Sequence, residues 1–298
     1  AGPLELESTA TNAQIEALMQ FKRWAILLPK LLSSQVEYNA TYTQARQNGN
    51  PNFFDQTRNR LVDILQDCEV LKVSGKAVTA ETGIAQALEI VLESLITASG
   101  FLSNRQFHKA TAIGELCVEV SDKITAGFPE LVFWPLLCRS ALGDAYVRLR
   151  RRADARAVLE KALEQAEAAT LENRLQSSIR VIAGACHSYL GRADMEEGLY
   201  ETALQKADAA IEDLEGKIWD LSDTKEDRED MATVVATACV FRGNCDSVQD
   251  RHEMALSWYR RSLQTLEKHR DLGTDYEQIV AQIQLDIERT NLLNTTAD

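Results

Sequence analysis

Leu142-Gly143-Asp144-Ala145-Tyr146, followed by Ala155, Leu159 and Ala162, is the segment of this 298-residue chain that most clearly indicates its fold class. Its apolar and small residues recur at the spacing of two amphipathic helices joined by a short turn. Gly143 and Ala155 lack bulk, so two helix backbones can approach closely there, and Tyr146 fills the space beside them. A single helical hairpin cannot bury its apolar face alone. The stretch therefore predicts a stack of similar hairpins.

Three further segments carry the same succession of small and large residues on a second helix. Gly243 precedes Ala255 by twelve residues, the same offset as in the quoted stretch. Earlier in the chain, Ala98 takes the glycine position and Phe101 the tyrosine position. The successive second-helix alanines are 45, 48 and 52 residues apart (110 to 155, 155 to 203, 203 to 255). The three further triplets are Ala110/Gly114/Cys117, Ala203/Ala207/Ala210 and Ala255/Tyr259/Ser262.

These motifs resemble the tetratricopeptide repeat (TPR), in which the first helix carries Leu-Gly-x-x-Tyr and the second carries alanines around a large residue. The resemblance implies an all-α fold of antiparallel helical hairpins stacked in a right-handed superhelix. The period is longer than the roughly 34 residues of that family. In the third pair, Gly184 and Tyr189 cannot both be placed without an insertion around Gly191 to Gly198. An irregular helical bundle with alanine-rich crossings is the alternative.

Turn signals divide the chain into four parts. We expect residues 1–12 to form a flexible lead-in and residues 13–78 to form N-terminal helices that pack on the array. Residues 79–271 are expected to form about four TPR-like pairs, and residues 272–298 a C-terminal capping helix and tail. The expected helices cover residues 14–47, 54–73, 82–99, 106–126, 133–149, 153–169, 171–190, 196–214, 231–247, 252–270 and 275–293.

The composition argues against several classes of protein. The 14 glycines and 5 prolines are too few for the many turns of a β-sandwich or barrel. A formal net charge of −13 argues against nucleic-acid binding, because phosphate contacts need Lys and Arg. No apolar run approaches the roughly 18 residues of a membrane-spanning helix. We expect a protein partner, no nucleic acid and no membrane span. The sequence does not predict the oligomeric state.

The cysteines indicate a compartment. They are scattered over the chain and form no CxxC pair, which is typical of free thiols buried in a reducing environment. We therefore expect an intracellular protein, in the cytoplasm or, as the alternative, in the nucleus. The six are Cys68, Cys117, Cys138, Cys186, Cys239 and Cys245.

No motif for chemistry is present in the sequence. The four histidines are spread over different pairs, and neither HExxH, GxSxG nor a glycine-rich phosphate loop occurs. Cys186 and His187 are adjacent, but neighbours on a helix point about 100° apart, so they cannot easily share a proton. We expect no catalytic residue, no cofactor and no metal site.

Two charged segments are candidates for binding. Residues 148–156 hold five arginines and one aspartate, a local charge of +4. They either complement the dipole of a helix end or dock a partner's carboxylates or phosphates. Residues 196–230 hold 13 acidic and four basic residues, a net charge of −9. They form either a solvated helix and connector or a surface for a basic peptide.

The resemblance implies a protein-binding adaptor that uses the inner face of its first helices and works as a subunit of a larger assembly. A dedicated chaperone that shields a basic client through the acidic segment is the alternative. An unrecognised enzyme and an RNA-binding repeat protein are weaker alternatives. The candidate partner-binding residues are Ser140, Asp144, Val147, Arg148, Arg151, Arg152, Asn244, Ser247 and Val248.

Overall fold

A computed structural model describes residues 53–74, 81–127, 131–169, 173–215, 225–267 and 274–296. These residues form helices and turns and contain no strand, so the all-α prediction is confirmed for this part of the chain. The expected lead-in 1–12 and the expected helix 14–47 lie outside it. The helices are α3 (Phe53–Ser74), α4 (Glu81–Ser103), α5 (Phe107–Gly127), α6 (Phe133–Arg148), α7 (Arg152–Ala168), α8 (Asn173–Glu196), α9 (Tyr200–Glu215), α10 (Lys225–Val248), α11 (His252–Glu267) and α12 (Thr274–Thr296).

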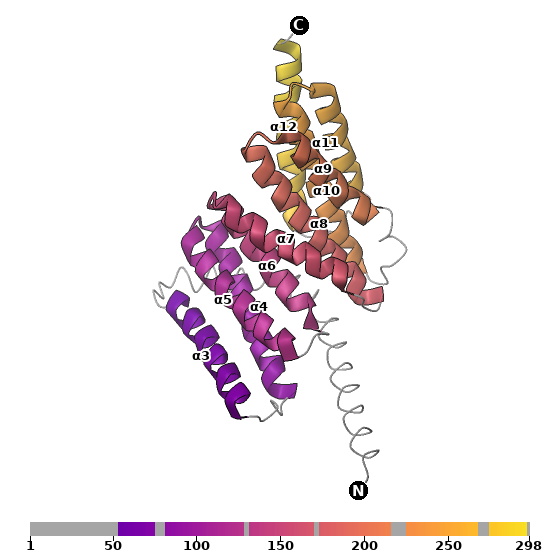
Figure 1. Cartoon of the computed structure of the whole chain (residues 1–298). Helices are drawn as coiled ribbons and strands as arrows, with labels where there is room; N and C mark the ends of the chain where they lie inside the picture. Colours follow the sequence, from indigo (N-terminus) through magenta and orange to yellow (C-terminus); the bar gives the residue numbers. More distant parts are fainter. Residues whose placement is uncertain are drawn as a thin grey trace.

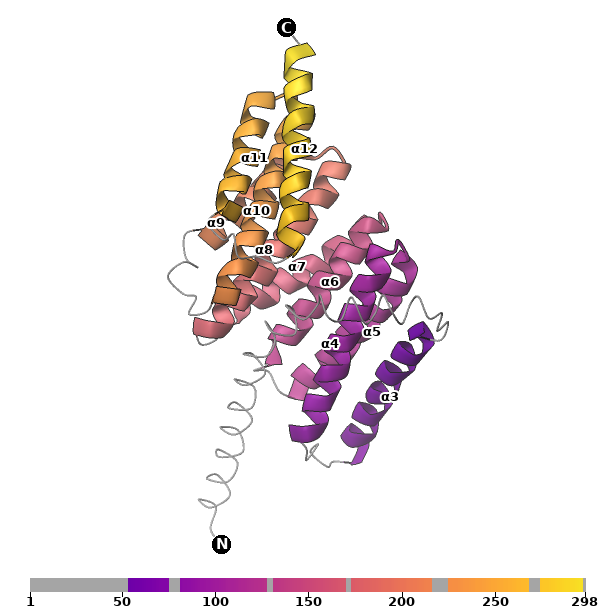
Figure 2. The same ribbon diagram turned by 180° about the vertical axis from the view of Figure 1, so that it is seen from behind.

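The helices pair in chain order. Hairpins form from α4 and α5, α6 and α7, α8 and α9, and α10 and α11, and the second helix of each hairpin also packs on the first helix of the next hairpin. The first helices α4, α6, α8 and α10 contact one another in the same order. Figure 1 shows α3 to α6 on one side of α7 and α8 to α12 on the other. Figure 2 confirms that α3 and α12 lie at opposite ends of the molecule.

All four hairpins turn in the same way. One residue in each turn adopts a left-handed conformation: Arg105 (φ 57°), Arg150 (φ 60°), Gly198 (φ 77°) and Asp250 (φ 58°). The amide of the following residue donates to a carbonyl five positions earlier, as from Arg151 to Tyr146 (2.9 Å). The four left-handed residues are 45, 48 and 52 residues apart (105 to 150, 150 to 198, 198 to 250). These are the intervals between the second-helix alanines, so the turn and the helix crossing repeat together.

The crossings depend on residues without a side chain. A Cβ added to Gly143 would lie 2.5 Å from Cγ of Leu159, and one added to Gly243 would lie 2.6 Å from Cε1 of Tyr259. Both distances are far below van der Waals contact, so a larger residue at either position would require Leu159 or Tyr259 to move. The predicted close approach of the first and second helices at Gly143 is confirmed.

The third hairpin differs from expectation. We predicted an insertion around Gly191 to Gly198, but α8 continues without a break to Glu196. Gly191 precedes Ala203 by twelve residues, as Gly143 precedes Ala155, and a Cβ added there would lie 3.2 Å from the backbone oxygen of Ala203 on α9 and 2.7 Å from Cε1 of Phe241 on α10. Gly191 is therefore the crossing glycine of this hairpin. The backbone of α8 is closely packed at Gly191, so the helix continues past this residue, although the glycine in the sequence suggested a helix end there.

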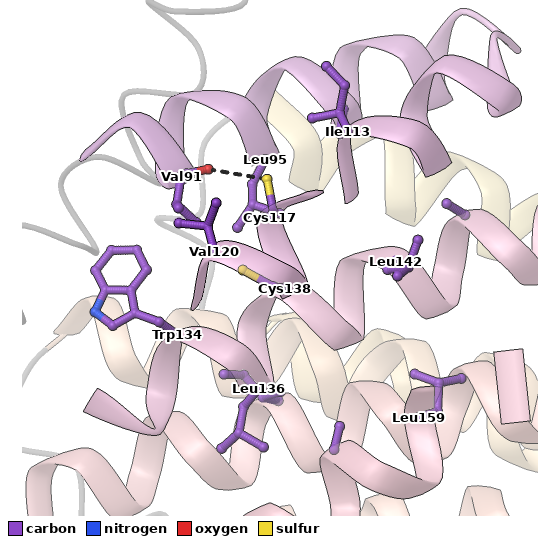
Figure 3. Close-up of a cluster of buried hydrophobic side chains, with 14 of the residues drawn as sticks. Val91, Leu95, Ile113, Cys117, Val120, Trp134, Leu136, Cys138, Leu142 and Leu159 are labelled. Carbon is purple, nitrogen blue, oxygen red and sulfur yellow. Dashed lines mark hydrogen bonds between the residues drawn. The ribbon is translucent and has the colours of Figure 1, made fainter. Parts of the chain in front are cut away.

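The largest buried cluster joins the first part of the array. It runs from Leu61 on α3 to Ala193 on α8, so one apolar core connects α3 to α8. Figure 3 shows its centre, where the thiol of Cys117 donates to the carbonyl oxygen of Val91 at 3.9 Å. In α6 almost every side chain is buried, because α4, α5, α7 and α8 surround it.

Candidate interaction surface

Three of the predicted inner-face residues belong to the core. Ser140 and Asp144 are buried, and Val147 is 1% exposed. All three lie on α6, whose side chains are mostly buried. The three residues lie on one face of α6, and that face packs against neighbouring helices. Val147 therefore contributes to packing and offers almost no area to a partner.

Two of the candidate residues on α10, Asn244 and Ser247, contact the hydroxyl group of Tyr259. The hydroxyl of Tyr259 donates to Oδ1 of Asn244 at 2.8 Å, and Ser247 and Thr290 also hydrogen bond to it. These contacts connect α10, α11 and α12. Burial raises the pKa of Tyr259 to about 12. Val248 at the end of α10 is 55% exposed, so it is the candidate on this helix that offers most surface to solvent.

Arg148 and Arg151 contact acidic groups of their own chain. Nε of Arg148 donates to both carboxylate oxygens of Asp144 at 2.9 Å. Nε of Arg151 donates to Oδ2 of Asp154 at 2.8 Å, and Nη1 of Arg151 lies 3.6 Å from Oε1 of Glu115 on α5. The guanidinium of Arg151 also stacks 4.4 Å from the centre of the Tyr146 ring. Both arginines are thus part of the array's own packing.

Arg152 and Arg156 connect the second hairpin to the third. Arg152 lies 3.8 Å from a carboxylate oxygen of Glu196 and 3.8 Å from one of Glu197. Nη2 of Arg156 lies 2.5 Å from Oδ1 of Asp194 and 2.6 Å from Oε2 of Glu197. Because all three acidic residues belong to the end of α8 and its turn, these ion pairs hold successive hairpins together.

One arginine of the basic segment is exposed and has no partner in the described part of the chain. Arg150 has no ion pair and no side-chain hydrogen bond within the described residues, although its four arginine neighbours are all paired. Arg105 occupies the same left-handed position in the first hairpin and is equally exposed and unpaired there. Sequence reasoning missed Arg105, because the position becomes recognisable only from the backbone conformation.

The third hairpin carries positions equivalent to these candidates that the sequence reasoning missed. Counting 48 residues from α6 places Ser188, Arg192, Met195 and Glu196 on the matching face of α8. Arg192 is exposed, and its Nε lies 3.7 Å from Oε1 of Glu196. The twelve-residue offset from Gly191 to Ala203 was the signal in the sequence that would have identified them.

Part of the acidic segment is also neutralised within the chain. Glu196 and Glu197 pair with arginines of α7, and Asp208 accepts a hydrogen bond from Nε of Arg242 at 2.9 Å. Arg242 reaches the buried Asp246 as well, at 3.3 Å. Residues 216–224 of this segment lie outside the described part of the chain. The described part therefore presents less free negative charge than the sequence count suggests.

The buried thiols are poor nucleophiles. Burial raises the pKa of Cys138 and of Cys186 to about 12, and Ser140 hydrogen bonds to the Cys186 thiol. A protonated thiol does not attack carbon or bind metal ions well. Across the described ranges, no group of three or more His, Cys, Asp or Glu residues is arranged to hold a metal ion. None of the helices described is both long and apolar enough to cross a membrane.

No model of a protein family matches the chain, and no curated protein matches it.

Proposed function

We propose that this protein is a non-enzymatic adaptor that binds a segment of a partner protein as a subunit of a larger assembly. The observation that supports this proposal best is the fourfold repetition of one hairpin geometry, with the same turn and the same interval to the second-helix alanine. Identical units that stack in one direction make an extended surface, and proteins use such surfaces for binding. The repetition also favours a TPR-like array over an irregular bundle.

The packing of the helices favours a curved array. Successive first helices contact one another directly, whereas among the described residues successive second helices make at most marginal contact. When successive hairpins pack more closely through their first helices than through their second helices, the stack curves toward the side of the first helices. The first helices would then line the inner side of a superhelix, as in tetratricopeptide arrays. Right-handed winding of this array is part of the proposal.

The accessible part of this inner side lies near the ends of the first helices. Arg148, Arg192 and Val248 are exposed at the C-terminal ends of α6, α8 and α10. The deeper positions are buried. A partner would therefore contact the helix ends and the adjoining turns, which form one edge of the stack.

Affinity capture followed by native mass spectrometry tests the adaptor function. Extract from the source cells is passed over the immobilised chain, and captured complexes are weighed intact. We expect a partner at a fixed stoichiometry. An unstructured chain of similar charge serves as the control for nonspecific capture. Absence of any stoichiometric partner, at physiological salt and across growth conditions, would contradict the adaptor function.

A chaperone that shields a basic client is the second candidate, favoured by the exposed Glu201 and Glu212 on α9. Binding to an acidic surface weakens steeply with salt, whereas binding through apolar contacts does so much less. A salt titration of the captured complex therefore distinguishes the two functions. A client that dissociates completely between 0.1 and 0.5 M salt would favour the chaperone over the adaptor.

A further inference from the structure

We propose that the turns of the first two hairpins form a docking edge for a short acidic segment of a partner protein, with Arg105 and Arg150 as its contact residues. This inference rests on the proposed adaptor function and specifies the chemistry of the partner.

Backbone conformation is the first observation. Arg105 and Arg150 adopt left-handed conformations, with φ of 57° and 60°. A residue with a Cβ is less stable there than glycine by about 1 kcal/mol. Gly198 shows that glycine serves in the same turn of the third hairpin. The chain therefore keeps arginine at two positions where folding alone would favour glycine.

The second observation is that both charges are available. Arg105 and Arg150 are exposed, and within the described residues neither guanidinium takes part in an ion pair or hydrogen bond. The paired arginines on either side of Arg150 show that acidic residues are within reach of this turn, yet no acidic residue among those described contacts Arg150. Carboxylates of a partner could bind these two guanidinium groups without displacing any contact of the array.

The surroundings of the first turn are positive. Between Ser94 and Gly114 the chain carries no acidic residue, and Lys109 stands over the rings of Phe54 and Phe101 at 5.8 and 5.5 Å. The second turn is connected to the first hairpin by the contact between Arg151 and Glu115. The two arginines thus belong to neighbouring turns along one edge.

The same edge becomes negative at the third hairpin, which limits the length of the anion that fits. Glu201 is exposed next to the third turn, and Asp250, whose side chain is 94% exposed, occupies the left-handed position of the fourth. A long polyanion such as RNA would extend from the positive turns onto these carboxylates and be repelled. A short acidic peptide segment spans the positive turns alone. The charge pattern therefore favours a protein segment with a few acidic residues.

The test uses the full chain and a fluorescein-labelled peptide with six consecutive glutamates, measured by fluorescence anisotropy at low salt. The double variant Arg105→Gly/Arg150→Gly should bind this peptide about fivefold more weakly, since each exposed ion pair contributes about 0.5 kcal/mol. The same variant should be more stable to heat, because glycine relieves both left-handed residues. Weaker binding by a more stable protein cannot result from misfolding.

A charge-matched variant, Arg260→Gln/Arg289→Gln, removes two exposed arginines from α11 and α12 and should bind the peptide as the wild type does. Equal loss in both variants would overturn the assignment of the docking edge, since net charge alone would then explain binding. Tighter binding of a six-nucleotide RNA than of the peptide would overturn the assignment of a protein partner. A partner captured equally by wild type and by the glycine variant would overturn the docking edge and leave the adaptor function standing.

Discussion

Arg156 on α7 and Asp194 on α8 form an ion pair between two hairpins, with 2.5 Å between Nη2 and Oδ1. The Asp194 side chain is almost fully buried, whereas that of Arg156 is 30% exposed. Removal of one partner leaves a buried charge uncompensated, which costs more than the ion pair itself contributes. We expect Arg156→Ala to lower the free energy of unfolding by about 3 kcal/mol, measured by urea denaturation followed by circular dichroism.

The second partner provides the control for this prediction. Asp194→Asn in the Arg156→Ala background removes the uncompensated charge, so it should restore part of the lost stability. A double variant that loses the full sum of the two single effects would show that the two residues do not interact.

The crossing at Gly143 leads to a second prediction. We expect Gly143→Ala to lower the free energy of unfolding by about 1 to 3 kcal/mol, because Leu159 is buried and cannot move away from an added methyl group. Gly114→Ala is the matched comparison, since its Cβ would lie 3.1 Å from the flexible end of Leu142. Equal destabilisation by both substitutions would argue against a special crossing at Gly143. Chemical denaturation measures both.

The third and fourth turns provide a prediction that is independent of side-chain packing. Nothing lies within 4 Å of a Cβ added to Gly198, yet its φ of 77° disfavours any other residue. We expect Gly198→Ala to lower the free energy of unfolding by about 1 kcal/mol and Asp250→Gly to raise it by about 0.5 kcal/mol. Thermal unfolding measures both variants, and melting temperatures that shift in the same direction would contradict this prediction.

The buried thiols predict how stability depends on pH. Burial raises the pKa of Cys138 and Cys186 from the usual value of 9.0 to about 12. Above pH 9 the unfolded chain loses these protons while the folded chain keeps them, so the free energy of unfolding falls as pH rises from 9 toward 12. Urea denaturation between pH 8 and 11 should show this decline, with a shallower slope for Cys186→Ala. An unchanged slope in that variant would show that Cys186 does not contribute.

Much of the fold could be predicted from local patterns. The periodicity of apolar residues predicted most helix boundaries within a few residues, and the offset from Gly143 to Ala155 predicted a close crossing. The helix boundaries of the third hairpin could not be predicted from the sequence, because a glycine in a helical segment is compatible both with a helix end and with a continuing helix. It ends a helix where its backbone is solvated, and it continues one where a neighbour such as Phe241 packs against it. Only the neighbour decides between them.

The candidate surface could be predicted less well. The basic segment 148–156 could be recognised in the sequence as one cluster of positive charge, but its arginines differ from one another in their contacts. Arg151, Arg152 and Arg156 meet carboxylates from other hairpins, whereas Arg150 meets none in the described chain. Sequence shows how many charges a segment carries. Which of them stay available depends on residues some forty positions away.

The helical class, the hairpin unit and the positions that need small residues can be predicted from the amino-acid sequence, because they follow from interactions among residues a few positions apart. The covered helix faces, the arginines that hold hairpins together and the left-handed turns become visible only in the folded chain. Burial and charge pairing depend on neighbours in space. In a stack of hairpins those neighbours come from the preceding and following units.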